Sequence, residues 1–260
     1  MTSKDSLGDR MKAYENVFNS KLPIRLPIIL RIDGKSFHSL TKKWKLDPAF
    51  DIDFRNIMSH TATYLCKNID GAKLAYTYSD EISIIIRNDM EINTTPWFDN
   101  KIEKICSVAA SFATAAFNGY RGEYINKLDT YKYPAVFDAR VFVLNLDEVN
   151  NYFIWRQQDS SRNSVSSLTR TLYSHKDCEY KNSSSMQEML FNKGINWNNI
   201  DTWKKRGFCI IKRKKIITNP ITAHKSDLTI TRSKWESDYE IPIFSNSNYI
   251  NENIINEDDN

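Results

Sequence analysis

Two apolar runs, each joined to an acidic turn, constrain the fold of this chain more than any other feature. The run over residues 26–30 leads into a turn that contains Asp33, and the run over 82–86 follows a turn that contains Asp80 and Glu81. Short runs rich in isoleucine are typical of buried strands. Carboxylates at the ends of such strands suit a divalent cation such as Mg²⁺, which prefers oxygen ligands. Turn chemistry alone also accounts for these acidic residues, so the topology has to decide.

The spacing of apolar residues predicts the order of the elements. In chain order, the sequence predicts a strand over 26–33, a helix over 52–68 with Asp51 as its N-cap, strands over 72–79 and 82–88, a helix over 98–118 that ends near Gly119, and a strand over 135–144. This β-α-β-β-α-β order is the split βαβ arrangement of ferredoxin-like folds. We therefore predict an α+β protein with a ferredoxin-like palm domain.

That order brings the two acidic turns together. A right-handed crossover makes the first and second strands parallel, and the third strand inserts antiparallel between them. Asp33 and the Asp80-Glu81 pair then share one rim of the sheet, on strands about 5 Å apart. Such a rim can hold two metal ions about 4 Å apart. Polymerase palms and nucleotide cyclases use this scheme, which is an analogy at the level of the fold.

Composition sets broad limits on the partners and the compartment. The 260 residues are 41% hydrophobic, enough for one large domain or a domain with an annex, and the net charge of +4 permits a polyanionic partner. The four cysteines show no CxxC spacing, so a reducing compartment is the default expectation. No run approaches the roughly 18 apolar residues of a membrane span. We expect a cytoplasmic protein, with a mitochondrial location left open.

Ordered motifs over residues 6–215 resemble a known family. The segments that carry the resemblance are Gly8-Asp9-Arg10-Met11-Lys12, Arg31-Ile32-Asp33-Gly34 with Phe37-His38, Ser79-Asp80-Glu81, Phe137-Asp138-Ala139-Arg140, Asn151-Tyr152-Phe153, Trp155-Arg156-Gln157 and Met186-Gln187-Glu188-Met189-Leu190. They resemble the tRNA-His guanylyltransferase superfamily. A set of motifs in this order is far more specific than either acidic turn alone.

The resemblance implies an enzyme that adds nucleotides to the 5′ end of RNA, in the 3′–5′ direction. In this family a 5′-monophosphate on tRNA or another structured RNA is activated with ATP or GTP. The 3′-hydroxyl of an incoming nucleoside triphosphate then attacks the activated end. Metal ions and cationic side chains offset charge in such phosphoryl transfers, and two Mg²⁺ ions are expected. The resemblance further implies a homo-oligomer, a tetramer, with no membrane partner.

One departure from the family pattern indicates the branch. True tRNA-His guanylyltransferases carry His-Ile-Asn-Asn where this chain has Ser161-Arg162-Asn163-Ser164. The Arg-Asn-Ser form resembles the guanylyltransferase-like proteins, which repair truncated tRNA 5′ ends by template-directed addition. We therefore predict templated addition, with untemplated addition of G to tRNA-His as the alternative. The match over residues 39–51 is loose, and no roles are assigned there.

Together with the resemblance, the composition divides the chain into three parts. Residues 1–145 are predicted to form the palm-like catalytic core with an N-terminal helix. Residues 146–244 are predicted to be a helical, basic extension that contributes to RNA binding. Residues 245–260, rich in Asn, Ser and acidic side chains, are predicted to be a disordered tail.

The acidic turns supply the predicted catalytic residues. Asp33, Asp80 and Glu81 are assigned to catalysis, and Asp33 and Asp80, with the Gly34 carbonyl, to the metal. The residues assigned to the nucleotide and its triphosphate are Lys35, Ser36, Phe37, His38, Ser79, Lys101 and Lys104. Lys101 and Lys104 share one helix face, which suits phosphate, and the resemblance favours Lys104. The alternatives are a solvated helix face, a plain turn serine and a structural histidine.

Basic and polar residues of the second half are assigned to RNA binding. They are Arg140, Arg156, Asp159, Asn163, Lys204, Lys205, Arg206, Lys212 and Arg213. Asp159 and Asn163 share a face of a predicted helix, and an Arg156–Asp159 ion pair is the alternative. Arg140 is either a phosphate ligand or a member of a buried ion pair. Two basic clusters, Lys204-Lys205-Arg206 and Lys212-Arg213, flank a predicted strand over 208–211. Contact of these clusters with RNA would be salt-dependent.

Two other functions compete with nucleotide addition. A nucleotide cyclase shares the palm and the metal scheme, but it needs neither the helix over 152–164 nor the basic C-terminal third. An RNA-binding module without catalysis has no reason to keep Asp33, Asp80 and Glu81. We therefore favour the nucleotidyltransferase.

Overall fold

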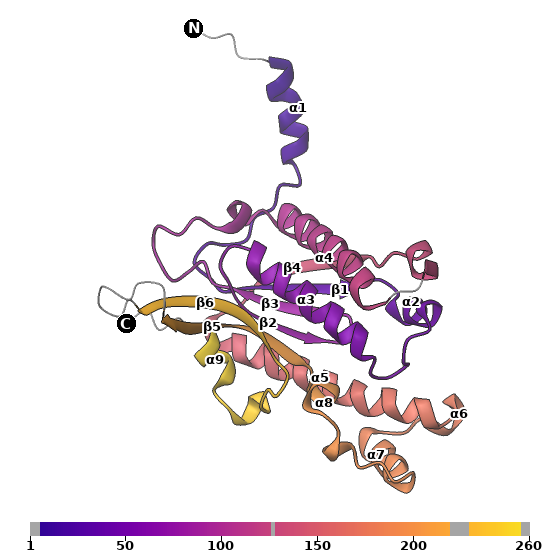
Figure 1. Ribbon diagram of the computed structural model, residues 1–260. Coiled ribbons are helices and arrows are strands. Elements are labelled where there is room, and N and C mark those ends of the chain that lie inside the picture. Colours follow the sequence, from indigo (N-terminus) through magenta and orange to yellow (C-terminus); the bar gives the residue numbers. More distant parts are fainter. Residues whose placement is uncertain (1–5, 126–127, 219–228, 256–260) are drawn as a thin grey trace.

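A six-stranded sheet lies at the centre of the protein, as the computed structural model shows (Figure 1). The structure describes residues 6–125, 128–218 and 229–255. The strands are β1 (Ile28–Gly34), β2 (Ala72–Tyr78), β3 (Glu81–Ile86), β4 (Phe137–Val143), β5 (Phe208–Thr218) and β6 (Thr229–Asp238). Their order is β4-β1-β3-β2-β5-β6, with each neighbouring pair antiparallel. The predicted insertion of the third strand between the first two is confirmed.

Some of the helices cover the two faces of this sheet. The helices of the described part of the chain are α1 (Ser6–Asn16), α2 (Phe37–Trp44), α3 (Ile52–Asn68), α4 (Ile102–Tyr124), α5 (Leu146–Leu172), α6 (His175–Cys178), α7 (Ser183–Asn192), α8 (Thr202–Arg206) and α9 (Tyr249–Ile254), with short 3₁₀ turns η1 (Trp97–Asn100), η2 (Leu128–Lys132), η3 (Trp197–Asn199) and η4 (Phe244–Asn246). Helices α3 and α4 lie on one face of the sheet, and α5 and α9 lie on the other (Figure 1).

Alternation along β1 separates two cores. Ile28, Leu30 and Ile32 are buried in the cluster formed with α3 and α4, whereas Ile29 belongs to the cluster formed with α5. Successive side chains of a strand point to opposite faces. Asp33 therefore shares the face of Ile29, where α5 lies, and this places the acidic rim beside α5.

The bounds of α3 and α4, the helices before β2 and after β3, can be compared with those predicted from the sequence. Helix α3 has the predicted bounds, and the Asp51 carboxylate caps it by accepting a hydrogen bond from the Phe54 amide at 2.8 Å. Helix α4, however, continues through Gly119 to Tyr124. A glycine costs a helix about 1 kcal/mol relative to alanine. That cost is too small to end a helix that still buries Phe117.

The C-terminal part joins the same sheet, although only a short strand was predicted there. Strand β5 pairs with β2, and β6 pairs with β5 over ten residue pairs. The sheet is therefore continuous across the boundary predicted after residue 145. The extension contributes two sheet strands as well as its helices.

The prediction of a disordered tail over 245–260 is wrong for residues 245–255. Helix α9 forms there and packs on the sheet, with Ile250 and Ile254 buried. Their spacing of four residues places both side chains on one helix face, and burying that face outweighs the polar composition. Residues 256–260 lie outside the described residues.

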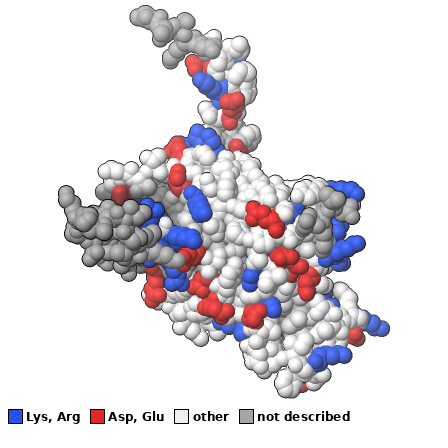
Figure 2. Space-filling model, viewed as in Figure 1, with Lys and Arg blue, Asp and Glu red and all other residues white. Residues whose placement is uncertain are grey.

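Helix α1 confirms the predicted N-terminal helix and projects from the body as an arm (Figure 1). In the described part of the chain α1 buries none of its residues, and Leu7, Met11 and Tyr14 on it are exposed. All four cysteines are free thiols. Among the described residues, no helix combines the length and apolar character needed to cross a membrane. In the view of Figure 2, acidic side chains lie across the middle and lower part of the face with basic ones among them, and further basic side chains lie along the right-hand margin.

Candidate active site

The two acidic turns meet at one rim of the sheet, as the sequence predicts. Asp33 of β1 is paired in register with Glu81 of β3 on one side and with Asp138 of β4 on the other. Asp80 lies in the tight turn between β2 and β3, next to Glu81. The register of the sheet therefore brings the carboxylates together.

The Asp80 carboxylate is held against the backbone at Gly34. Ser79 adopts left-handed backbone angles, with φ of 51°, and its hydroxyl donates to Asp80 Oδ1 at 2.9 Å. A Cβ placed on Gly34 would lie 2.8 Å from Asp80 Oδ2 and 2.2 Å from the Phe37 ring. Only glycine leaves room for this approach. The left-handed backbone conformation of Ser79 is strained for a residue other than glycine, and residues strained in this way are often found at functional sites.

The environment of Asp80 favours a bound cation. Burial, together with the neighbouring carboxylates of Asp33 and Glu81, raises the pKa of Asp80 to about 6, against the opposing effect of the hydrogen bond from Ser79. A cation between Asp33 and Asp80 would relieve this penalty on the charged form. The described residues contain no cluster of three or more His, Cys, Asp or Glu ligands. Mg²⁺ needs only one or two carboxylates together with phosphate oxygens and water, so Asp33, Asp80 and the Gly34 backbone fit it.

Glu81 differs from the two aspartates, because arginines engage its carboxylate. Arg156 donates to both Glu81 oxygens, from Nε at 2.7 Å and from Nη2 at 2.6 Å. Arg31 Nη2 lies 2.6 Å from Glu81 Oε2. Behind them, burial raises the pKa of Tyr152 to about 12, and this neutral phenol contacts Ser83 at 2.8 Å. Glu81 therefore lies in an ion-pair network at the rim, which separates its role from that of the aspartates.

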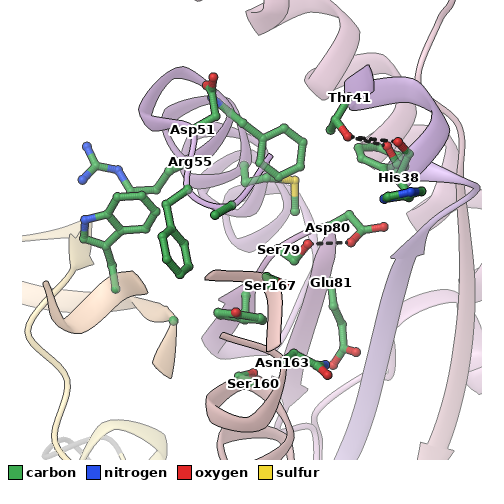
Figure 3. A pocket seen from close by; sticks show the side chains of 18 of the residues that line it. His38, Thr41, Asp51, Arg55, Ser79, Asp80, Glu81, Ser160, Asn163 and Ser167 are labelled. Atoms are coloured by element: carbon green, nitrogen blue, oxygen red, sulfur yellow. Dashed lines mark hydrogen bonds between the residues drawn. The ribbon is translucent and has the colours of Figure 1, made fainter. Parts of the chain in front are cut away.

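A cavity of about 430 Å³ opens beside the rim. Figure 3 shows its wall: Asp80 and Glu81 on one side, His38 and Thr41 of α2 above, and Asn163, Ser160 and Ser167 of α5 below. Pockets of roughly 300–1,000 Å³ suit small ligands and cofactors. A phosphate-bearing ligand bound in this cavity would lie next to the candidate cation site.

The residues predicted to bind the nucleotide are only partly brought together. Ser79, His38 and Phe37 line the cavity. The Phe37 ring belongs to the hydrophobic core, where it packs against Phe117 with ring centroids 5.4 Å apart. Lys35 and Ser36 are exposed and are not part of the cavity lining.

Lys101 and Lys104, which were predicted to bind the triphosphate, lie at the other end of the sheet from Asp33 and Asp80. They line a separate depression with Trp97 and Phe98, and Lys104 Nζ lies 5.0 Å from the Phe98 ring centroid. Further along α4, Thr114 accepts a hydrogen bond from the Phe137 amide, and Phe137 pairs with Gly34 at the rim. The ten helical residues from Lys104 to Thr114 span about 15 Å, which explains the separation.

Of the predicted RNA-binding residues on α5, Arg156, Asp159 and Asn163 line the cavity. The alternative Arg156–Asp159 ion pair also forms, at 3.2 Å. Arg140 of β4 has a 54% exposed side chain that pairs with Asp138, so it is not in a buried ion pair.

The two basic clusters are exposed or half-buried and several members have local partners. Lys204 pairs with Asp201 at 2.8 Å, and Lys205 Nζ donates to the Asn198 carbonyl at 2.6 Å. Arg213 lies 3.4 Å from Asp238. The remaining members are Arg206 at the end of α8 and Lys212 on β5, whose ammonium lies 6.0 Å from the Trp235 ring centroid.

Several cavity residues were missed by the sequence reasoning. Arg31 was noted only within its motif, although its position two residues before Asp33 on a strand places it on the same face. Phe50, Arg55 and Trp203 form the far wall, where the Arg55 guanidinium lies 4.9 Å from the Trp203 ring centroid. No short motif links residues so distant in sequence, and only the fold joins them.

A ferredoxin-like palm with two aspartates at the rim of its central strands, beside a cavity of nucleotide size, is typical of palm-type nucleotidyltransferases. Comparison with known proteins gives the family. The family described as tRNAHis guanylyltransferase matches residues 8–145. The chain belongs to this family and is a nucleotidyltransferase.

Solved structures support the assignment. A bacterial tRNA(His) guanylyltransferase (Thg1)-like protein in complex with ATP is 44% identical, covers 96% of this chain and 99% of its own, and superposes with a TM-score of 0.83. The complex of such a bacterial protein with GTP is 42% identical, covers 97% and 100%, and has a TM-score of 0.79. The tRNA(His) guanylyltransferase of Saccharomyces cerevisiae is 26% identical, covers 76% and 91%, and has a TM-score of 0.64.

Proposed function

We propose that this chain adds nucleotides to the 5′ end of tRNA, or of a similarly structured RNA with a 5′-phosphate, by template-directed 3′–5′ extension. The observation that supports it most is the meeting of Asp33 and Asp80 at the mouth of the 430 Å³ cavity. The similarity to a bacterial protein solved with ATP and with GTP supports nucleoside triphosphates as the substrates.

The proposed chemistry has two steps. First, an oxygen of the RNA 5′-monophosphate attacks the α-phosphorus of ATP or GTP, a P–O–P bond forms, and pyrophosphate leaves. Second, the 3′-hydroxyl of an incoming nucleoside triphosphate attacks the RNA 5′-phosphorus, a phosphodiester forms, and the nucleoside monophosphate leaves. Bound Mg²⁺, two ions in this proposal, supplies charge neutralisation for both displacements.

The residues at the rim divide the work. Asp33 and Asp80, with the Gly34 carbonyl, hold the metal, because their crowding already favours a cation. The Ser79 hydroxyl orients Asp80. His38 lies at the cavity wall, where it can orient a base or a phosphate. Asn163 of α5 lines the cavity close to Glu81, and we assign it to contact the RNA end.

The basic extension is proposed to bind the RNA body. Lys212 and Arg213 are exposed on β5, and the end of α8 places Lys205 and Arg206 beside the cavity residue Trp203. Contacts from such residues to phosphates would weaken steeply with salt. The family resemblance further supports a homo-oligomer, and the exposed apolar side chains of α1 are available for one.

The segment that replaces the His-Ile-Asn-Asn signature supports templated addition. Ser164 is buried, donates to the Lys204 carbonyl at 2.7 Å and accepts from the Trp197 indole at 2.9 Å. Arg162 and Asn163 are exposed. Ser164 thus ties α5 to α8, and a segment built this way lacks the side chains that the guanylyltransferases of tRNA-His carry here.

The test is a set of tRNAs that lack the first nucleotide, with the opposing 3′-strand base changed in turn among A, C, G and U. Templated repair predicts addition of U, G, C and A respectively, on tRNAs with unrelated anticodons. Addition of G whatever the opposing base would refute templating and leave untemplated guanylyltransfer. Formation of a cyclic nucleotide from ATP or GTP alone would instead indicate a cyclase.

A further inference from the structure

Both carboxylate oxygens of Glu81 are fully engaged within the protein. Oε1 accepts from Arg156 Nε at 2.7 Å and from the Ser83 hydroxyl at 3.3 Å. Oε2 accepts from Arg156 Nη2 and faces Arg31 Nη2, both at 2.6 Å. A carboxylate oxygen offers about two lone pairs, so these contacts fill both oxygens. A metal ion would have to displace an arginine to reach Glu81.

The contacts join three separate elements. Arg31 comes from β1, Glu81 from β3 and Arg156 from α5. Their side chains are 19%, 13% and 9% exposed respectively. Two guanidinium groups repel each other at such burial, and the shared carboxylate is what allows them to lie side by side. The trio by itself carries a formal charge of +1 next to the aspartates, and Asp159 also pairs with Arg156 at 3.2 Å.

The arginines retain unused hydrogen-bonding capacity at the cavity. Both line it, together with Asp33, and Arg31 Nη2 lies 3.9 Å from Asp33 Oδ2. Among the described residues, the buried Arg31 Nε has no hydrogen-bond partner. A buried donor without a partner is costly, and a guanidinium is suited to bind phosphate oxygens with two N–H groups at once.

Building on the proposed function, we propose that Glu81 is a positioning residue rather than a metal ligand. It holds Arg31 and Arg156 so that their remaining N–H groups bind phosphate groups of the nucleoside triphosphate beside Asp33 and Asp80. Ser83 and Tyr152 support Glu81 from behind. The carboxylates at this rim thus have two tasks, since the aspartates hold the cation and Glu81 holds the cationic side chains.

The test is Glu81→Gln, with equilibrium binding of ATP and of AMP measured in Mg²⁺ and again in EDTA. The glutamine amide would face a guanidinium and disrupt the arrangement. ATP affinity should fall by about tenfold to a hundredfold in both buffers, because a shift of about 1 Å is enough to lose such contacts. AMP, with fewer phosphates, should lose much less. Asp80→Asn should behave oppositely, with a loss of ATP affinity in Mg²⁺ only.

A matched control comes from the other neighbour of Asp33. Asp138→Asn removes one carboxylate at the same rim, but the Asp138 side chain is 61% exposed and pairs with the exposed Arg140. It should leave ATP affinity unchanged. Arg156→Lys keeps the charge but loses the two-point contact with Glu81, and its ATP affinity should fall in EDTA as well. This second variant tests the proposal even where Glu81→Gln does not fold.

Three results would overturn the proposal. A Glu81→Gln loss confined to Mg²⁺ buffer would make Glu81 a metal ligand. Equal losses for ATP and AMP would make the arginine arrangement merely structural. An equal loss in Asp138→Asn would point to the charge of the rim rather than to the arginines. A wild-type protein that binds ATP but extends no RNA would reject the proposed function alone, because the binding measurements need no RNA.

Discussion

The two ends of the central sheet differ in the charged side chains that they carry. At one end, Asp33 and Asp80 crowd together, and burial raises the pKa of Asp80 to about 6. At the other end, Lys101 and Lys104 line a shallow depression, and a hydrogen bond from Lys21 lowers the pKa of the exposed Asp99. At the first end, Asp80 has no ion-pair partner among the described residues, although Arg31 lies 3.9 Å from Asp33; at the other end, Lys21 pairs with the exposed Asp99. The buried carboxylate of the first end therefore favours a bound cation, whereas the second end exposes its charged side chains to solvent.

The comparison is tested most strongly by removing carboxylates at each end. Asp33→Ala and Asp80→Ala should each reduce nucleotide addition by about a thousandfold or more, because the metal ions supply several kcal/mol of transition-state stabilisation. Asp99→Ala, at the opposite end, should keep near-normal activity. Rates on a truncated 5′-monophosphate tRNA give the answer, with circular dichroism to confirm folding. Near-normal turnover by a folded Asp80→Ala protein would remove the basis of the metal assignment.

Lys104 sharpens the comparison, because it is remote from the rim although the family resemblance favours it as a triphosphate ligand. We expect Lys104→Ala to slow activation of a 5′-monophosphate by about a hundredfold, through lost charge stabilisation. It should spare addition to RNA that already carries a 5′-triphosphate. Because α4 keeps Lys104 away from the rim of its own chain, we expect the lysine to act on a neighbouring copy in the proposed homo-oligomer.

A mixing experiment checks this expectation. Inactive Asp80→Ala protein and Lys104→Ala protein, unfolded and refolded together, should regain part of the activity when the lysine acts on a neighbouring copy. Equal losses on both RNA substrates, or no recovery on mixing, would show that Lys104 has no such role.

The pKa of Asp80 predicts a pH-dependent difference in stability. Because the pKa is higher in the folded protein than its ordinary value of 3.8, the folded state binds more protons between pH 4 and 6. The resulting stabilisation is complete below pH 4 and is lost as the pH rises through 6. At pH 7.5 without metal, Asp80→Asn should melt roughly 2–4 °C above the wild type. This shift corresponds to a gain of about 1 kcal/mol in the free energy of unfolding.

Melting curves from pH 4 to 8 in EDTA measure this difference, and it should shrink towards pH 4. Added Mg²⁺ with ATP should stabilise the wild type more than Asp80→Asn, since binding to the folded state raises stability. A difference in melting temperature that is the same at all pH values would mean that the charge of Asp80 does not destabilise the folded protein.

The smallest effect is expected for the arm at the far end of the sheet. Deletion of residues 1–16 should change the melting temperature at low protein concentration by less than about 1 °C, because α1 buries no residue in the chain. Differential scanning fluorimetry measures it, and Ile250→Ala serves as a positive control because that side chain is fully buried. A fall of several degrees on deletion would show that α1 packs against something that a single chain does not supply.

The fold was predictable where each element carried its own signal. The isoleucine runs defined β1 and β3, and the rule for right-handed crossovers placed Asp33 next to Glu81. The order of the strands fixes which strand ends meet at one rim, and this order follows from the pattern of the elements along the chain. For this reason the rim aspartates could be placed from local sequence alone.

Other parts depended on long-range packing and could not be predicted. Strand β6 consists mostly of polar residues, and it takes its place by pairing with β5 and by contacting α3 through Ser237 and Ser59. The distance of Lys104 from the rim depends on how α4 lies across the sheet, which helix spacing does not reveal. The Ile250–Ile254 spacing was a usable signal for α9, but the surrounding Asn and acidic residues concealed it.

The position of β2 has a consequence for the biosynthesis of this protein. Its neighbours are β3, which follows directly in the chain, and β5, which begins only at Phe208. While the ribosome is still making the segment between them, β2 is an open edge whose backbone groups can pair with another chain. The nascent chain therefore remains vulnerable to misassembly until β5 emerges, and the N-terminal 145 residues expressed alone would keep that edge permanently.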